Sequence, residues 1–403
     1  MKVLIISPCV NLPVPAVRGG AVSTLIEYLV KENEIEQLMD LTILSVYDAK
    51  AKEKAKEYLN TKIEFIEPLK VLEQVDCLID SFLDVGKKRK AQHQYLKKLY
   101  SIRFIKKYMK EHDFDKVVFE NSGYLLNALK NKNLAKKYRG KLYYHLHNDI
   151  PNSVYISGVR QCKLLLISEY LKKHVNEVCG QDMGNQCAIV KNGFDCEFFS
   201  QKFSENEKQI LRKNLSIAKG KKIIMFAGRI VPAKGIEELT QAFEKLNRDD
   251  VILMVVGAHN FGTRQTSEFQ MKMEKFFSRL GDRVCFTGFV PYNEIWKYYK
   301  IADVAVLPSI WEEPAGLTMI EACAAGIPLV TTNSGGIPEY VDSSNVMLLD
   351  RNGNLIAELQ KSINEIFNNL DIWKMKAKRA QKLTREKFNT KNYYKAFWTG
   401  INE

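Results

Sequence analysis

The sequence lacks closely spaced cysteines, a leader-like segment and a long apolar run. Its eight cysteines are scattered, and no two of them form a Cys-x-x-Cys pair. This spacing argues against a zinc site or a disulfide scaffold and predicts reduced thiols in a cytoplasm. The N-terminal apolar run reaches a proline too soon for a signal peptide, and no run of about 18 apolar residues could span a bilayer. We therefore expect a cytoplasmic protein without a membrane-spanning segment.

Two nucleotide-binding fingerprints are also missing. The loop after the first expected strand contains Arg18-Gly19-Gly20 but no G-x-G-x-x-G, and the chain has no Gly-Lys-Ser/Thr of a Walker loop. These absences argue against a nicotinamide dehydrogenase and against a P-loop nucleotidase.

What is present is an ordinary globular composition with a basic balance. The 403 residues are 46% hydrophobic and 27% charged, and 60 Lys and Arg against 47 Asp and Glu give a net charge of +13. Such a length allows about two or three domains with a sizeable core. The excess of positive charge favours anionic partners, which include nucleotide sugars, phospholipid and nucleic acid.

Apolar runs alternate with amphipathic stretches along both halves of the chain. This alternation predicts parallel, helix-covered sheets and hence an α/β protein with two Rossmann-like domains in series. We place the boundary at an Asn-Gly turn followed by a polar run, between Lys191 and Ser204. The expected strands are 3–7, 41–46, 63–66, 116–119, 142–146, 164–168, 188–190, 223–227, 251–256, 284–286, 304–307, 329–331 and 346–349.

The stretch from Pro308 to Glu339 predicts a binding site. A buried strand, 303–307, runs into it. The stretch then reads as a loop with two carboxylates, a helix that opens at Gly316, a second strand and a Ser-Gly-Gly loop. The first backbone N–H groups of that helix, on Gly316 and Leu317, lack intrahelical partners and suit a phosphate. Seven residues separate Glu313 from Glu321, so both carboxylates can face one cleft and accept from the hydroxyls of a sugar. Glu312 is a rival for the first carboxylate.

A second loop with binding potential follows the first strand of the second half. Arg229 and Lys234 lie on it, just before a helix. A bidentate arginine and a mobile lysine beside a helix N-terminus suit a diphosphate.

The pair Glu313-x7-Glu321 with Pro-x-Gly between resembles the signature of the retaining nucleotide-sugar glycosyltransferases of family 4. The resemblance implies the GT-B fold, in which two Rossmann-like domains with parallel sheets face across a cleft. It places Glu313 by the donor sugar, Glu321 on the nucleotide ribose, and Arg229 and Lys234 on the diphosphate. The base is read near Val290, largely by backbone groups. One departure is Ala315, which stands where many members carry an aromatic residue.

The same resemblance extends to scattered points of the first half. It places the Gly19-Gly20 loop near the donor diphosphate and acceptor, and a histidine at a strand end close to the transferred sugar. His147 is that histidine here, because strand alternation puts His145 and His147 on one face and the strand ends there. Asp149, in the loop that follows, could orient an acceptor hydroxyl.

Residues 85–110 carry ten basic and no acidic side chains, with apolar residues at helical spacing. A basic amphipathic helix can lie on an anionic membrane. A core-packed helix with a solvated basic face explains the pattern equally well, so both interpretations stay open. No nucleic-acid-binding pattern accompanies the segment, and a nucleic acid partner is not expected.

The expectation is a retaining hexosyl- or N-acetylhexosaminyl-type glycosyltransferase that uses a nucleotide diphosphate sugar, with UDP as the nucleotide. The acceptor would be a saccharide or a lipid-linked compound in cell-surface glycan synthesis. Cationic side chains would replace a metal, so neither a metal nor a cofactor is expected. The alternative is a non-catalytic nucleotide-sugar-binding subunit. The expected domains are an acceptor-binding domain over 1–190, a donor domain over 191–380 and a helix over 381–403 that crosses back to the first domain.

Overall fold

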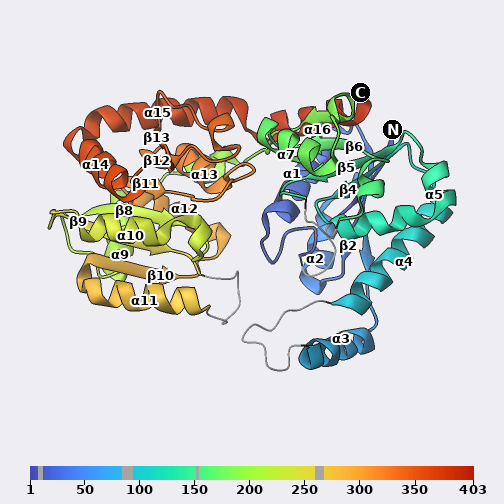
Figure 1. The fold of residues 1–403 in the computed structure, drawn as a ribbon, viewed down its shortest axis with the longest axis horizontal. Helices are drawn as coiled ribbons and strands as arrows, with labels where there is room; N and C mark the ends of the chain where they lie inside the picture. The colour runs from blue at the N-terminus through green and yellow to red at the C-terminus, as the bar shows by residue number, and fades with distance from the viewer. Residues whose placement is uncertain (8–11, 84–93, 151–153, 259–266) are drawn as a thin grey trace. The chain divides into compact units, whose positions relative to one another are not determined.

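The computed structural model describes residues 1–7, 12–83, 94–150, 154–258 and 267–403. The chain divides into two compact units (Figure 1). The first unit comprises residues 1–193 and 390–403, and the second comprises residues 194–389. The C-terminal segment therefore belongs to the first unit.

The first unit contains a seven-stranded parallel sheet in the order β3-β2-β1-β4-β5-β6-β7. In its central strands every residue after the first is buried, because the side chains meet helices on both faces. The order reverses between β1 and β4, and their pairing sets Val3 opposite Lys116. The strands are β1 (Lys2–Ile6), β2 (Asp40–Val46), β3 (Thr61–Ile66), β4 (Lys116–Glu120), β5 (Leu142–Leu146), β6 (Lys163–Leu166) and β7 (Cys187–Ile189).

Helices cover this sheet, and the last helix of the chain is one of them. The hydroxyl of Tyr394 donates to Asn33 Oδ1 at 2.7 Å, and that of Tyr143 donates to the Ile401 carbonyl at 2.8 Å. These bonds tie the last helix to α1 and to the sheet. The helices are α1 (Ala21–Glu36), α2 (Ala49–Lys54), α3 (Lys70–Leu83), α4 (Tyr95–Glu111), α5 (Lys132–Lys137), α6 (Ile156–Val159), α7 (Glu169–Cys179) and α16 (Thr390–Asn402).

The second unit contains a six-stranded parallel sheet in the order β10-β9-β8-β11-β12-β13. This is the doubly wound order of Rossmann domains, and it reverses between β8 and β11. Ligands of such sheets bind beyond the carboxyl ends of the strands on either side of that reversal. The strands are β8 (Lys222–Ala227), β9 (Val251–Val256), β10 (Val284–Gly288), β11 (Val304–Leu307), β12 (Leu329–Thr332) and β13 (Met347–Leu349).

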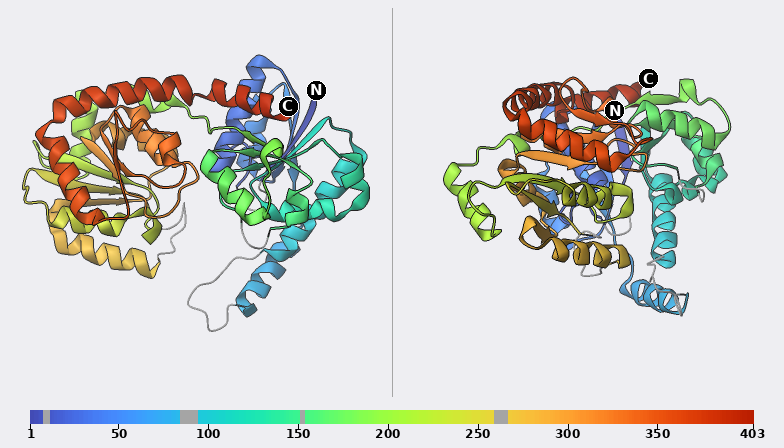
Figure 2. Two further views of the ribbon diagram at one scale, coloured as in Figure 1. Left: turned by 45° about the horizontal axis from the view of Figure 1, so that its top comes forward. Right: turned by 60° about the vertical axis from the view of Figure 1, so that its left-hand side comes forward.

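Helices lie on both sides of the second sheet (Figure 2). On one side α10 packs with α11 and α14, and on the other α13 packs with α12 and α15. None of the helices within the described ranges is long and apolar enough to cross a membrane. The helices are α8 (Cys196–Ser200), α9 (Glu205–Asn214), α10 (Ile236–Glu244), α11 (Glu268–Leu280), α12 (Tyr292–Ile301), α13 (Leu317–Ala325), α14 (Leu355–Asn368) and α15 (Leu370–Lys387).

The predicted strands are confirmed, and their ends shift by about two residues at most, the usual uncertainty of boundaries. The sequence placed the domain limits after residues 190 and 380, whereas the compact units meet after residues 193 and 389. The second limit lies later because α15 continues to Lys387 as part of the second unit, and only α16 belongs to the first. Part of the predicted basic segment, 85–93, lies outside the described residues.

Candidate functional site

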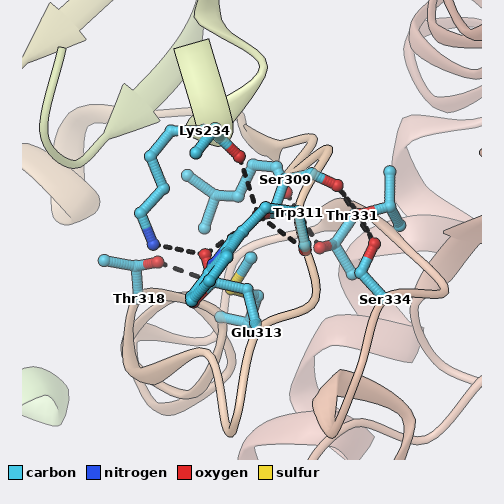
Figure 3. A network of polar contacts seen from close by, with 11 residues as sticks. Lys234, Ser309, Trp311, Glu313, Thr318, Thr331 and Ser334 are labelled. Carbon is cyan, nitrogen blue, oxygen red and sulfur yellow. Dashed lines mark hydrogen bonds and ion pairs between the residues drawn. The ribbon is translucent and has the colours of Figure 1, made fainter. Parts of the chain in front are cut away.

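The centre of the site in the second unit is an ion pair across the reversal of strand order. Lys234 lies on the loop after β8, and Glu313 lies on the loop after β11. The ammonium of Lys234 pairs with Glu313 Oε1, as Figure 3 shows. Both side chains are largely withdrawn from solvent, so their attraction is weakly screened. The structure thus brings together two residues that the sequence placed in one site.

Glu313 is held by its neighbours as well as by the lysine. The hydroxyl of Ser309 donates to Glu313 Oε1 at 2.9 Å, and the amide of Gly336 donates to the Glu313 carbonyl at 2.7 Å. Ser309 is itself fixed, because its carbonyl accepts from the hydroxyls of Thr332 and Ser334. Figure 3 shows Ser309, Glu313 and Ser334 close together in this part of the site. The carboxylate therefore has a defined position before any ligand binds.

Close backbone approach makes the pair possible. Gly235, at the start of α10, has φ +67°, and a Cβ there would lie 1.9 Å from the Pro308 carbonyl oxygen. Only glycine combines this left-handed conformation with so short an approach. The β8 and β11 loops can therefore lie in contact, which is what lets Lys234 reach Glu313.

The amino end of α13 faces the same pair of loops. Gly316 precedes the helix with φ +79°, and among the described residues no side chain caps this end. The first N–H groups of the helix are therefore left for an external acceptor, and the helix dipole adds partial positive charge. This confirms the predicted helix start at Gly316 and Leu317, with an arrangement suited to an anion.

Glu321 lies one turn inside α13, in a different environment from Glu313. It is buried, and the hydroxyl of Tyr299 donates to its Oε2 at 3.0 Å. Burial raises the pKa of Glu321 to about 7, although the Tyr299 hydrogen bond acts in the opposite direction. A ligand that offers further hydroxyl donors to this carboxyl would stabilise its charged form. The ribose diol expected from the sequence is such a ligand.

The remaining predicted residues of the second unit lie at the carboxyl edge of its sheet. Arg229 is exposed on the β8 loop, five residues before Lys234, and Val290 is half-buried just beyond β10. Glu312, the rival to Glu313, points elsewhere: one oxygen pairs with Arg351 and the other accepts from the amide of Gly335. The seven-residue spacing therefore selected the carboxylate that faces Lys234.

A buried polar cluster lies at the carboxyl edge of the first sheet. His145 Nδ1 lies 3.1 Å from Glu120 Oε1, and His147 Nε2 lies 3.0 Å from Glu120 Oε2. Burial alone would raise the pKa of Glu120, but the two histidines outweigh it and hold that pKa at about 2. Burial and the neighbouring His145 lower the pKa of His147, which favours its neutral form.

This cluster has the donor types of a divalent cation site. Its three donor atoms lie within 4.8 Å of one another. Each ring nitrogen, however, meets its own carboxylate oxygen, which is the arrangement of two separate hydrogen bonds. The hydrogen bonds alone account for the geometry.

Gly19 and Gly20 also belong to the first unit. Both have positive φ, +75° and +101°, and Gly20 immediately precedes α1. A Cβ on Gly20 would lie 2.7 Å from the Leu12 side chain. Glycine is thus needed here for the backbone path itself.

Part of the chain is similar to known glycosyltransferases. Residues 207–386 match the family described as glycosyl transferases group 1. The uncharacterized glycosyltransferase MJ1607 of Methanocaldococcus jannaschii is 32% identical over 205 residues, which are 50% of each chain. The lipopolysaccharide 1,2-N-acetylglucosaminetransferase of Salmonella typhimurium is 30% identical over 232 residues, which are 56% of each chain. The chain therefore spans about half the length of these curated relatives.

The fold similarity covers the whole chain. The crystal structure of Anabaena Alr3699/HepE in complex with UDP aligns with 100% of both chains, with a TM-score of 0.73 and 19% sequence identity. The chain has the GT-B fold. The predicted fold class, two Rossmann-like domains with parallel sheets, is thereby confirmed. Within this GT-B chain the second unit carries the segment that matches glycosyl transferases group 1.

Four residues that contact the predicted carboxylates and histidines were missed by the sequence reasoning. Ser309 and Tyr299 bind the two glutamates, Arg351 binds Glu312, and Glu120 binds both histidines. Glu120 gave a usable signal, since it is a carboxylate at the end of a predicted strand. The other three lie far in sequence from their partners or carry no pattern of their own.

Proposed function

We propose that this protein is a retaining glycosyltransferase. It would transfer a sugar from a nucleotide diphosphate sugar, with UDP as the nucleotide, to a saccharide or lipid-linked acceptor in cell-surface glycan synthesis. The observation that carries the proposal is the Lys234–Glu313 pair beside the uncapped amino end of α13. It lies in the segment that matches glycosyl transferases group 1.

Each part of a nucleotide sugar has a counterpart in the second unit. The diphosphate would lie against Lys234, Arg229 and the first N–H groups of α13, where positive charge gathers. The ribose hydroxyls would donate to Glu321, and the base would lie near Val290. The sugar would then lie by Glu313. These roles match those that the family resemblance assigns.

The chemistry is a front-face displacement at the anomeric carbon. The bond from this carbon to the diphosphate oxygen breaks, and a bond to the acceptor oxygen forms on the same face. The acceptor proton passes to the departing phosphate oxygen. Lys234, Arg229 and the α13 amides would stabilise the growing negative charge, the kind of contribution that is commonly the largest in catalysis. Two cations would serve in place of a metal, and no metal or cofactor is part of the proposal.

The first unit would contribute the acceptor side. His147 would border the transferred sugar as a neutral ring held by Glu120, because its lowered pKa disfavours a cationic acid. The Gly19-Gly20 loop would lie near the diphosphate and the acceptor.

The nucleotide and sugar classes are inferred by analogy. Anabaena HepE has been solved with UDP, with UDP-glucose, and with UDP and glucose. The Salmonella relative is a lipopolysaccharide N-acetylglucosaminetransferase. Both favour a UDP-linked hexose or N-acetylhexosamine as the donor and a saccharide as the acceptor.

Glu313→Gln tests the proposal because two measurements should move in opposite directions. Loss of the charge beside Lys234 leaves the ammonium free for the diphosphate, so UDP should bind about fivefold more tightly, roughly 1 kcal/mol. Release of UDP from UDP-sugars should fall at least about 100-fold, the usual effect of removing a transition-state contact. Calorimetry with UDP and a UDP-release assay over a panel of UDP-sugars measure the two quantities.

Lys234→Ala is the comparison variant and should weaken both binding and turnover. Full turnover in Glu313→Gln would refute the site assignment. Tight UDP binding by the wild type, without turnover of any UDP-sugar in the presence of saccharide acceptors, would instead favour the non-catalytic subunit.

A peripheral association with an anionic membrane completes the proposal. Within the described residues α4 exposes Tyr95 and Leu99 together with basic side chains. Apolar side chains among basic ones are typical of surfaces that bind anionic lipid. Such a surface would bring a lipid-linked acceptor to the enzyme.

A further inference from the structure

Arg351 lies in the loop after β13 and reaches the loop that carries Glu313. Its Nη2 pairs with Glu312 Oε1, and its Nη1 donates to the Ile310 carbonyl at 2.9 Å. One planar guanidinium thereby holds both a side chain and a main-chain group of the same loop, with little freedom to rearrange.

The loop after β12 also hydrogen-bonds to the segment that carries Glu312 and Glu313. The amide of Gly335 donates to Glu312 Oε2, and the amide of Gly336 donates to the Glu313 carbonyl at 2.7 Å. Gly335 has φ +55°, and a Cβ there would lie 2.3 Å from the Glu313 carbonyl oxygen. The main chain on both sides of the Glu313 side chain is therefore clamped.

This clamp matters once a donor binds. The Glu313 side chain is held by Lys234 and Ser309. A diphosphate that takes the Lys234 ammonium removes the first of these contacts. The position of the Glu313 carboxylate then depends on Ser309 and on the clamped main chain.

We infer that Arg351 is a positioning residue that, through Glu312, holds Glu313 against the donor sugar. The inference rests on the proposed function. Arg351 contacts the loop from the side opposite to Lys234 in the order of strands, so it would not touch the diphosphate. Its loss should disturb the reacting centre and leave nucleotide binding in place.

Arg351→Met tests this separation. The variant keeps an unbranched apolar side chain but loses the charge and both contacts. The kcat for UDP release from the best UDP-sugar should fall about 10- to 100-fold, the size of effect expected when a catalytic group is misplaced by about 1 Å. The dissociation constant for UDP should stay within about twofold of wild type. Arg351→Lys should recover part of kcat, because a point charge can still pair with Glu312.

Arg248→Met is the matched control. Arg248 pairs with Asp250 at 2.8 Å in the same unit but at the amino ends of the strands. The side-chain exposures of the two pairs are alike, 24% and 44% for Arg351 and Glu312 against 20% and 46% for Arg248 and Asp250. Both variants should therefore show similar small shifts in Tm, and only Arg351→Met should lose kcat.

The outcomes separate this inference from the proposed function. Unchanged kcat in Arg351→Met, with turnover lost in Glu313→Gln, would overturn the inference and keep the function. An equal loss of UDP affinity and kcat would overturn it too, since that indicates general disruption of the site. A wild-type protein that neither binds UDP nor turns over any UDP-sugar would overturn the proposed function itself.

Discussion

Glu313 and Glu321 belong to one spacing motif, but their surroundings differ. Glu313 pairs with Lys234 and accepts from Ser309. Within the described residues the Glu321 carboxyl accepts from the Tyr299 hydroxyl, and burial raises its pKa to about 7. The two carboxyls of one motif therefore meet different partners, a cation in one case and a hydroxyl in the other.

The raised pKa of Glu321 predicts a pH-dependent stability. Its value in the folded protein is about 7, against an ordinary value of 4.5. Between these limits the folded state holds an extra proton, so the free energy of unfolding falls as the pH rises from 4.5 to 7. Relative to Glu321→Gln, the wild type should lose about 3 kcal/mol over that interval and no more above it.

Denaturant unfolding of both proteins at pH 5, 6, 7 and 8 measures this difference. Glu358→Gln, at an exposed position on α14, is the control and should follow the wild type. Parallel pH profiles for wild type and Glu321→Gln would show that burial does not perturb Glu321.

At the scale of elements, the site depends on loops that touch. Gly235 lets the β8 loop approach the Pro308 carbonyl, and Gly335 lets the β12 loop approach Glu313. The three loops belong to adjacent strands, because β8, β11 and β12 are neighbours in the sheet. The doubly wound topology brings the loops to one edge, and the glycines bring them into contact.

Gly235→Ala should separate backbone strain from loss of contact. The new Cβ would lie 1.9 Å from a carbonyl oxygen, so either Pro308 or the start of α10 must move. The control is Gly220→Ala, which has φ +86° but no atom within 4 Å of the added Cβ. The control should lose about 1 kcal/mol of unfolding free energy from the left-handed backbone alone. Gly235→Ala should lose about 1 to 3 kcal/mol more, as overpacked sites do.

Thermal and denaturant unfolding check this difference, and UDP titration shows whether Lys234 is displaced. Equal losses for the two glycine variants would mean that the contact between the β8 and β11 loops does not constrain the site.

The sequence predicted the elements well because they follow from local patterns. Buried strands are short apolar runs, and the start of α13 is marked by Gly316. The sequence also favoured Glu313 over Glu312, through a spacing that the family resemblance supplied. It could not show that the two carboxylates have different partners. Arg351, the partner of Glu312, lies 39 residues away and meets it only after the sheet has formed.

In the first unit, too, a contact between residues far apart in the sequence could not be predicted. Alternation placed His145 and His147 on one face, and their ring centroids are indeed 4.1 Å apart. The carboxylate that hydrogen-bonds to both rings is Glu120, on the adjacent strand. Strand order is a property of the whole sheet, and a single sequence without pairing information does not reveal it.

At the scale of the whole molecule, the excess of basic residues predicts binding to an anionic membrane through α4. Arg103, Lys107 and Lys110 are exposed basic residues of α4. Reversing all three to glutamate should weaken binding to phosphatidylserine vesicles at least about tenfold, given about 1 kcal/mol for each basic residue near an anionic surface. A matched reversal of Lys374, Lys378 and Lys382 on α15 should change it little. Vesicle sedimentation at 0.15 M salt measures both.

Equal losses from the two triple reversals would indicate a net-charge effect rather than a surface on α4. Unchanged binding in the α4 variant would remove the membrane from the proposal while leaving the transferase intact.

The central claim is that the second unit binds a nucleotide diphosphate through Lys234. The most direct measurement is the Tm of wild type and Lys234→Ala with UDP, GDP, ADP and dTDP at millimolar concentration. At 100 times its dissociation constant a ligand adds about 2.7 kcal/mol, a shift of several degrees for a protein of this size. We predict that UDP raises the Tm of the wild type and that Lys234→Ala loses this shift. An unchanged Tm with all four nucleotides, or equal Tm shifts in wild type and Lys234→Ala, would contradict this claim.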